Sequence, residues 1–144
     1  MSDQEARREV LRLLAGVRRA PEQPFPGGAT EADLDDLAQR VGVPLPAVLV
    51  DWLRICKGEA ICAGGIFGAR PDRDFLDIAA HLDLHPQWRE LGWLPVAGDG
   101  CGNHYVLVRG GEVAFVESVS DPDSVASVAG ASLWMFLRTL LASG

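Results

Sequence analysis

Apolar residues recur at helical spacing in four stretches of the chain. The first stretch places Ala6, Val10 and Leu14 among regularly spaced arginines, which predicts an amphipathic helix over residues 3–20. The sequence PEQPFPGG follows, and its three prolines and two glycines cannot continue a regular element. We therefore expect residues 21–28 to form a linker, or an arm that lies across the body of the protein.

Two shorter helices are predicted next. Thr30 and Asp33 have the spacing of a capping box, and Gly42 is suited to end the helix that they begin. A second helix is expected from about Pro46 to Lys57, with Gly58 as its stop. Each helix carries an apolar stripe, formed by Leu34, Leu37, Ala38 and Val41 in the first and by Leu49, Trp52, Leu53 and Cys56 in the second.

Short apolar runs separated by glycine replace the helical pattern from Ile61 onward. A strand pair is predicted in AICAGGIFGA, and later strands in WLPVA, HYVLV and VAFVES. The last two are joined by RGGE, a two-glycine hairpin turn. The polar residues 71–92 are expected to form a loop with one or two helical turns, and DPDSVASVAGA a second loop. Ser132 is then placed to cap a final helix with apolar positions Leu133, Phe136, Leu137, Leu140 and Leu141.

Helices at both ends therefore enclose a series of strands joined by hairpins. This order predicts an α+β fold with a largely antiparallel sheet, and not alternating βαβ units. The length of 144 residues fits one domain, and 48% apolar with 23% charged residues predicts a packed core. We divide the chain into residues 1–27, a helix and linker, and residues 28–144, the α+β domain.

Composition also limits the cellular compartment and the classes of molecule that the protein can bind. The amino-terminal residues lack the apolar region of a secretion signal, no stretch is long and apolar enough for a membrane span, and the three cysteines are an odd number. We expect a cytoplasmic protein with reduced thiols and no membrane contact. The net charge is −7, and beyond residue 20 there are 8 basic against 17 acidic side chains. Such a body repels nucleic acid and can attract a basic protein, although the charge also fits a role in solubility alone.

Three segments resemble a known family. LPAVLVDWLRICKG, WLPVAGDGCGNHYVLV and the terminal helix LWMFLRTLL resemble, in the expected order, parts of the SUKH superfamily, which includes the yeast Smi/Knr cell-wall regulators. The resemblance covers roughly residues 28–141. The resemblance implies a structural role for the motif residues Pro46, Gly58, Trp93, Pro95, Gly98, Asp99, Gly102 and Asn103.

The resemblance implies a mixed sheet backed by helices, no cofactor and a role in protein binding. Bacterial domains similar to this one are mostly immunity proteins that neutralise a polymorphic toxin, commonly a nuclease. The resemblance therefore favours an immunity protein, monomeric or weakly dimeric, that binds a basic toxin domain. A housekeeping adaptor similar to the yeast regulators is the alternative, and a hydrolase is a weaker third.

Several motifs that suggest chemistry have a simpler explanation. GDGCGN precedes a strand and not a helix, so a turn with Asp99 or Asn103 bonded to local amides is favoured over a phosphate cradle. His81 and His85 lie four apart, but paired cysteine ligands are lacking and Pro86 breaks the helix, which favours ordinary surface or boundary residues over a metal site. Cys101 and His104 suggest a nucleophile only weakly, because no orienting group can be named. We expect no catalysis and no metal.

The remaining candidates are for partner contacts in the polar region before the strand predicted in WLPVA. Asp72, Asp74, Asp77 and Asp83 are acidic there, and Trp88 stands among polar neighbours. A half-exposed tryptophan beside acids is typical of a binding hot spot. The competing interpretations are a solvated acidic loop and a tryptophan that anchors residues 70–92 to the body.

Overall fold

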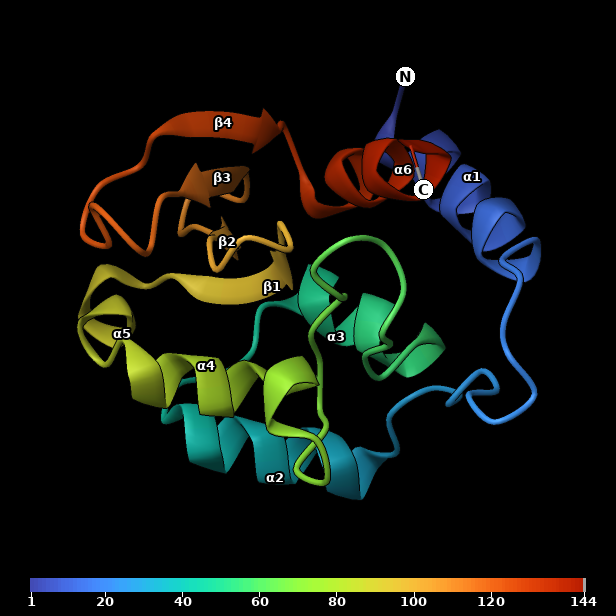
Figure 1. The fold of residues 1–144 in the computed structure, drawn as a ribbon, viewed down its shortest axis with the longest axis horizontal. Coiled ribbons are helices and arrows are strands. Elements are labelled where there is room, and N and C mark those ends of the chain that lie inside the picture. Colours follow the sequence, from blue (N-terminus) through green and yellow to red (C-terminus); the bar gives the residue numbers. More distant parts are fainter. Residues whose placement is uncertain (144) are drawn as a thin grey trace.

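The centre of the molecule is an antiparallel sheet with the strand order β1-β2-β3-β4 in the computed structural model, which describes residues 1–143 (Figure 1). The strands are β1 (Leu94–Gly98), β2 (His104–Leu107), β3 (Val113–Val116) and β4 (Ser127–Gly130). The first three fall where the sequence predicts them. Residues 108–112 form the expected turn, in which Val108 N donates to Glu112 O at 3.0 Å.

The fourth strand corrects the sequence interpretation, which expects a loop over residues 121–131. β4 pairs with β3 through Phe115 and Ser127 and through Ala114 and Val128. It is an edge strand whose residues are exposed or half-buried. Because neither face of it is fully covered, it lacks the alternation of apolar and polar residues that identifies a strand.

The glycine-rich segment 60–69 does not form the predicted pair of regular strands. Its pairing is limited to isolated bridges, which join Ile66 to Glu59 and to Ala97 on β1, and Gly68 to Asp77. A Cβ atom added to Gly64 would lie 2.2 Å from the backbone carbon of Gly98. The glycines therefore allow one backbone to lie directly against another, which a regular strand with side chains does not permit.

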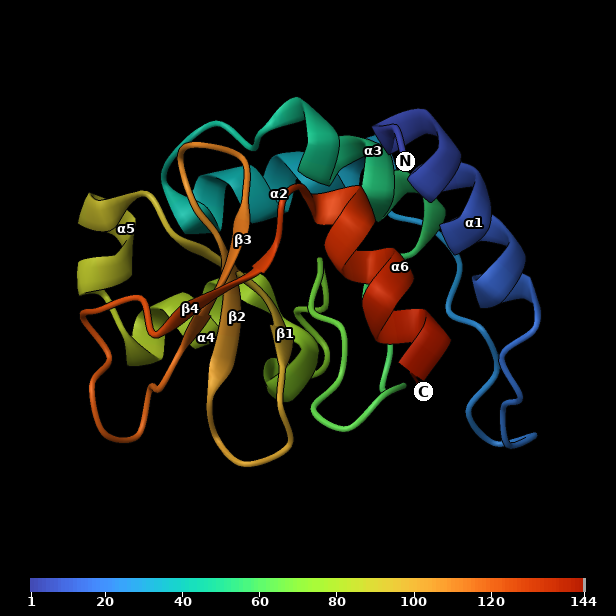
Figure 2. The same cartoon turned by 90° about the horizontal axis from the view of Figure 1, so that it is seen from above.

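The two terminal helices pack against each other, as Figures 1 and 2 show. They are α1 (Asp3–Ala15) and α6 (Leu133–Ser143). The first is shorter than predicted because the helix ends at Gly16. Ser132 caps α6 as expected, since its Oγ accepts from Met135 N at 3.2 Å. The same hydroxyl donates to Asp3 Oδ1 at 2.6 Å, which joins the starts of both helices.

The next helices are α2 (Glu31–Val41) and α3 (Ala47–Ile55). The capping box of α2 is confirmed, with Thr30 and Asp33 each bonded to the other's backbone N–H, and Gly42 ends the helix with a φ of 87°. α3 ends two residues before the predicted Lys57. Gly58 follows with a φ of 116°, and a Cβ there would lie 2.9 Å from Gly68 N.

Residues 71–92 are more helical than predicted. They contain a 3-10 turn, η1 (Asp74–Leu76), and two short helices, α4 (Ile78–Leu84) and α5 (Gln87–Leu91), with Pro86 between them. α4 packs against α2 and β1. These elements cover one face of the sheet, and α6 contacts β4 at the other.

The core follows from this arrangement. On β2, His104 faces Trp88 of α5 with 5.1 Å between ring centroids, whereas the next residue, Tyr105, faces Phe136 of α6 at 4.9 Å. Successive residues of a strand point to opposite faces, so both faces of the sheet are covered. Trp52 of α3 is fully buried and makes an edge contact with Trp134.

The predicted α+β class is confirmed. The resemblance implies a mixed sheet, but the four-stranded sheet is antiparallel. Over residues 1–143 the one parallel pairing is an isolated bridge between Gly68 and Asp77. No helix in this described part of the chain has the length and apolar character to cross a membrane.

Candidate functional site

The predicted contact residues separate into exposed and buried groups. Asp72, Asp74 and Asp83 are exposed, but Asp77 and Trp88 are 1% and 0% exposed. Asp72 and Asp74 precede α4, whereas Asp83 lies near its far end. The sequence therefore identified acidic positions that do not form one continuous surface.

Asp77 has a structural role that excludes it from a free surface. Its Oδ2 accepts from Ala80 N at 3.1 Å and from Arg40 Nη1 at 2.5 Å, and its Oδ1 accepts from Arg70 N at 2.9 Å. The carboxylate thus caps α4 and joins α2 to the segment before α4. Its interpretation as a solvated acid was wrong, because its oxygens are committed to these donors.

Trp88 is also not a free contact, and the expectation of a half-exposed ring was wrong. Its indole Nε1 donates to Pro122 O at 2.7 Å, and its ring stacks on His85 with centroids 4.2 Å apart. The anchoring interpretation agrees with these contacts. Trp88 holds α5 against residues 117–126, a segment distant in the sequence.

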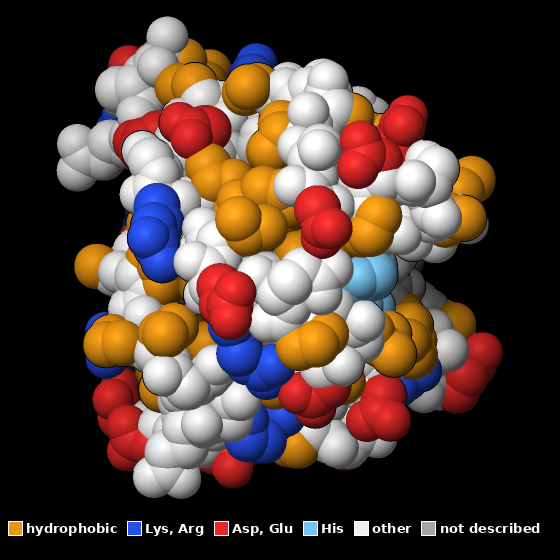
Figure 3. Space-filling model, turned by 90° about the vertical axis from the view of Figure 1, so that its left-hand side faces the viewer, with side chains coloured by type: hydrophobic (Ala, Val, Ile, Leu, Met, Phe, Trp, Pro, Cys, Tyr) orange, Lys and Arg blue, Asp and Glu red, His pale blue; other side chains and the backbone are white. Residues whose placement is uncertain are grey.

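This anchoring creates an exposed surface from α5, the end of α4 and the loop 117–126. We call it the acidic face. Gln87 Nε2 donates to Asp123 Oδ1 at 2.9 Å and strengthens the same junction. The face consists of acidic residues Asp83, Glu90, Glu117, Asp121 and Asp123 and apolar residues Leu84, Leu91, Val119 and Val125, all exposed. Figure 3 views this side of the molecule, on which hydrophobic and acidic side chains lie side by side.

The charges of the acidic face are mostly uncompensated. Arg89 pairs with Asp83 at 2.9 Å, and its guanidinium also donates to the carbonyl oxygens of Arg40 and Val41. Among the described residues, Glu90, Glu117, Asp121 and Asp123 form no ion pair with Lys or Arg. Four carboxylates therefore remain available to a cationic partner, next to apolar side chains that can be buried in a contact.

The sequence did not identify the loop part of this face. One signal was present: the chain contains no lysine or arginine between Arg109 and Arg138, while Glu117, Asp121 and Asp123 fall inside that interval. The position of this interval beside α5 depends on Trp88 and Pro122, which are far apart in the sequence. Charge distribution could have identified the acids but not their neighbours.

A cluster of all three histidines lies behind the acidic face. The rings of His81 and His85 are 4.9 and 5.5 Å from that of His104. His104 Nε2 is 2.9 Å from His81 Nδ1, and His104 Nδ1 is 2.6 Å from Ser118 Oγ. His81 and His85 are thus partly buried members of one cluster, and not independent surface residues.

The positions of the ring protons in this cluster follow from the contact that His81 makes with a backbone carbonyl. His81 Nε2 lies 2.8 Å from Phe75 O, which can only accept, so His81 carries its proton on Nε2. His81 Nδ1 then accepts from His104 Nε2, and Ser118 donates to His104 Nδ1. Burial, followed by the neighbouring His81 and His85, lowers the pKa of His104 to about 4, and burial also lowers the pKa of His81. The cluster is neutral at pH 7.

The suggested pair of Cys101 and His104 is not formed. Both ring nitrogens of His104 are bonded to other side chains, and Cys101 is exposed on the turn. The turn has the predicted structural character: Asp99 Oδ1 accepts from Cys101 N at 2.7 Å and from Asn103 N at 3.0 Å. Within residues 1–143, no group of three His, Cys, Asp or Glu side chains is arranged to hold a metal ion.

The residues expected to be structural lie within β1, beside regular elements or in the turn after β1. Pro46 precedes α3, Pro95 belongs to β1, and Gly98 ends that strand. Trp93 is 9% exposed, and the centroid of its ring lies 6.3 Å from that of Trp88. Gly102 has a φ of 89°, a value that favours glycine in this turn.

Comparison with known proteins adds one match. The model of the SMI1 / KNR4 family (SUKH-1) matches residues 28–139. This range includes α2 to α5, the sheet and most of α6, and it begins after α1, at the last residue of the proline-rich segment. A comparison with curated proteins gives no match.

Proposed function

The chain belongs to the SMI1 / KNR4 family (SUKH-1), and from this premise we propose that it is a non-catalytic immunity protein whose acidic face binds a basic toxin domain. The family supports protein binding as the general role. The toxin, the immunity role and the surface are our proposal.

The observation that carries this proposal is the exposure of Glu90, Glu117 and Asp121, without cationic partners in the described residues, beside Leu84 and Val119. Unpaired charges attract an oppositely charged protein and accelerate encounter. Exposed apolar side chains on the same face provide area that binding removes from water. Leu84 is 71% exposed and Val119 is 75% exposed, so both have much area to lose.

A nuclease toxin fits these charges for a physical reason. A nuclease must attract phosphates and therefore carries basic side chains around its active site. A protein with a net charge of −7 and a concentrated acidic face can cover such a site and compete with the nucleic acid. Neutralisation then occurs by occlusion and requires no reaction by this chain.

The test is to express the chain with the protein encoded beside its gene and to purify the pair at low salt. We expect a complex, loss of the neighbour's toxic activity in that complex, and release as salt rises, because ions screen charges beyond roughly 8 Å at physiological ionic strength. Absence of a complex at low salt contradicts the immunity role. Several unrelated partners with no toxic activity among them support the adaptor alternative instead.

A further inference from the structure

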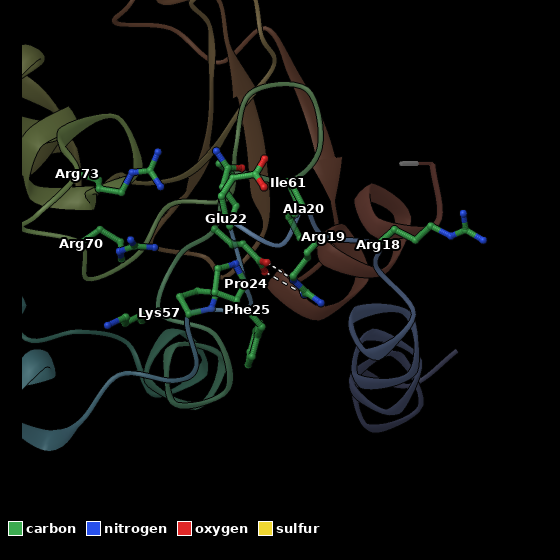
Figure 4. A pocket seen from close by; sticks show the side chains of 14 residues that line it. Arg18, Arg19, Ala20, Glu22, Pro24, Phe25, Lys57, Ile61, Arg70 and Arg73 are labelled. Atoms are coloured by element: carbon green, nitrogen blue, oxygen red, sulfur yellow. Dashed lines mark hydrogen bonds and ion pairs between the residues drawn. The ribbon is translucent and has the colours of Figure 1, made fainter.

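A cavity on another part of the surface has the opposite charge. It has a volume of about 420 Å³ and lies between the arm of residues 18–26 and two segments of the body, 57–61 and 70–73 (Figure 4). Its basic lining residues are Arg18, Arg19, Lys57, Arg70 and Arg73, and its acidic ones are Glu22 and Glu59. This excess of cations occurs in a chain with a net charge of −7.

The arm is fixed to the body by specific contacts. Arg19 forms an ion pair through two nitrogens with Glu59, which is 6% exposed, and its guanidinium carbon lies 4.9 Å from the centroid of the Phe25 ring. Lys57 N donates to Gly27 O at 2.9 Å. Of the two alternatives for residues 21–28, these contacts agree with an arm against the body, and the cavity has a defined wall on each side.

The cations of the cavity differ in their partners. Arg19 is neutralised by Glu59, and Arg70 pairs with Asp72 at 3.2 Å while donating to Gly58 O at 2.7 Å. Lys57 and Arg73 form no ion pair within the described part of the chain. Figure 4 shows Lys57, Arg70 and Arg73 on the same side of the cavity, and Arg18 pointing away from them. We call the cavity with these three side chains the basic pocket.

We propose that the basic pocket binds a small organic ligand that carries a phosphate group. Lys57 and Arg73 are half-buried and form no direct ion pair within residues 1–143, although the carboxylates of Asp72 and Asp33 lie near enough to Lys57 to interact with its charge. Such cations favour a doubly charged anion, and guanidinium groups match phosphate oxygens in geometry. The volume is in the range of small-molecule sites. Pro24, Phe25 and Ile61 line the same cavity, which provides an apolar wall for the rest of the ligand.

Only part of the basic pocket lies within the residues that the family model matches. The arm of residues 18–26 precedes the matched range 28–139, whereas the opposite wall lies inside it. A ligand that contacts both walls would hold the arm on the domain. This proposal concerns different residues from the acidic face, so either can fail without the other.

The experiment uses the full chain and three probes: adenosine monophosphate, inorganic phosphate and citrate. We expect adenosine monophosphate to bind in calorimetric titration and to shift the amide NMR signals of residues 57–61 and 70–73. The double variant Lys57→Gln/Arg73→Gln should weaken this binding at least about tenfold, or about 1.4 kcal/mol. The control Arg8→Gln/Arg109→Gln has the same net charge and should bind as the wild type does.

Three outcomes overturn the proposal. They are no binding of either phosphate probe, equal binding by the Lys57→Gln/Arg73→Gln variant and the wild type, and equally tight binding of citrate. The last result would assign the pocket to anions in general and not to phosphate. Binding of inorganic phosphate as tight as that of adenosine monophosphate would remove the role of the apolar wall.

Discussion

The indole Nε1 of Trp88 donates a hydrogen bond to the carbonyl oxygen of Pro122 at 2.7 Å, across 34 positions of the sequence. This bond joins α5 to the loop 117–126 and so assembles the acidic face from two distant segments. The fully buried ring also contacts His85 and His104. The packing of α5 and the shape of the acidic face therefore depend on the same side chain.

Replacing Trp88 tests that anchor. Trp88→Phe keeps most of the ring but loses the donor, so we expect the free energy of unfolding to fall by about 1 to 3 kcal/mol, because Pro122 O loses its partner. Trp88→Ala should cost about 3 to 5 kcal/mol because it also leaves a cavity. Urea unfolding measures both values. If Trp88→Phe unfolds at the same midpoint urea concentration as the wild type, the hydrogen bond to Pro122 contributes nothing to stability.

The two acidic partners of Arg40 offer a matched comparison. Asp77 has a side chain 2% exposed, whereas Asp36 pairs with the same guanidinium at 2.9 Å but is 52% exposed. We expect Asp77→Asn to destabilise the fold by about 1 to 3 kcal/mol, since it weakens the hydrogen bonds to a buried carboxylate, while Arg40, 31% exposed, keeps Asp36 as a partner. Asp36→Asn should change stability by less than about 1 kcal/mol. Equal effects in urea unfolding would contradict the role assigned to Asp77.

The histidine cluster predicts loss of stability in mild acid. The pKa of His104 is about 4 in the fold, mainly through burial and then through His81 and His85, with Asp99 opposing, and about 6.5 when unfolded. The unfolded chain therefore binds more protons between these values. The contribution of neutral His104 to the free energy of unfolding is complete above pH 6.5 and is lost as pH falls toward 4.

For His104 alone this loss amounts to about 3 kcal/mol. The pKa values of His81 and His85 are lowered as well, and their effects have the same sign. Urea unfolding at several pH values between 7 and 4 measures the total, and His104→Gln should reduce the slope. A constant free energy of unfolding from pH 7 to 4.5 would contradict the neutral cluster.

The glycines of residues 60–69 give a separate prediction for the backbone. A Cβ at Gly64 would lie 2.2 Å from a backbone carbon, whereas one at Gly16 has its nearest neighbour at 3.6 Å and a negative φ. We expect Gly64→Ala to be strongly destabilising, by more than about 3 kcal/mol, because two backbones must separate. Gly16→Ala should lie within about 1 kcal/mol of the wild type. Thermal unfolding that does not distinguish these variants would contradict the close approach.

The sequence predicted elements whose signals are local. Thr30 and Asp33 lie three residues apart and identify the start of α2, and Ser132 identifies the start of α6 in the same way. β4 lacked such a signal because an exposed edge strand has no buried face. Trp88 stands among polar neighbours, and its cover is supplied by Pro122, so its local composition indicated exposure where the fold gives burial.

The candidate site was less predictable than the fold for the same reason. Asp83 was identified and lies on the acidic face, while Asp77 is buried by Arg40 and Arg70, which come from other segments. The acids of the loop 117–126 become part of a surface only when α5 lies beside them. Composition gives the sign of a charge, but long-range contacts decide whether that charge is free.

The most direct test of the account is the affinity of the chain for the proposed toxin partner after charge removal on the acidic face. Glu117→Gln/Asp121→Asn should weaken binding by at least about tenfold and reduce its salt dependence. The control Asp35→Asn/Asp36→Asn on α2 changes the net charge equally and should leave the affinity unchanged. If both double variants bind the partner as tightly as the wild type, the acidic face is not the binding surface.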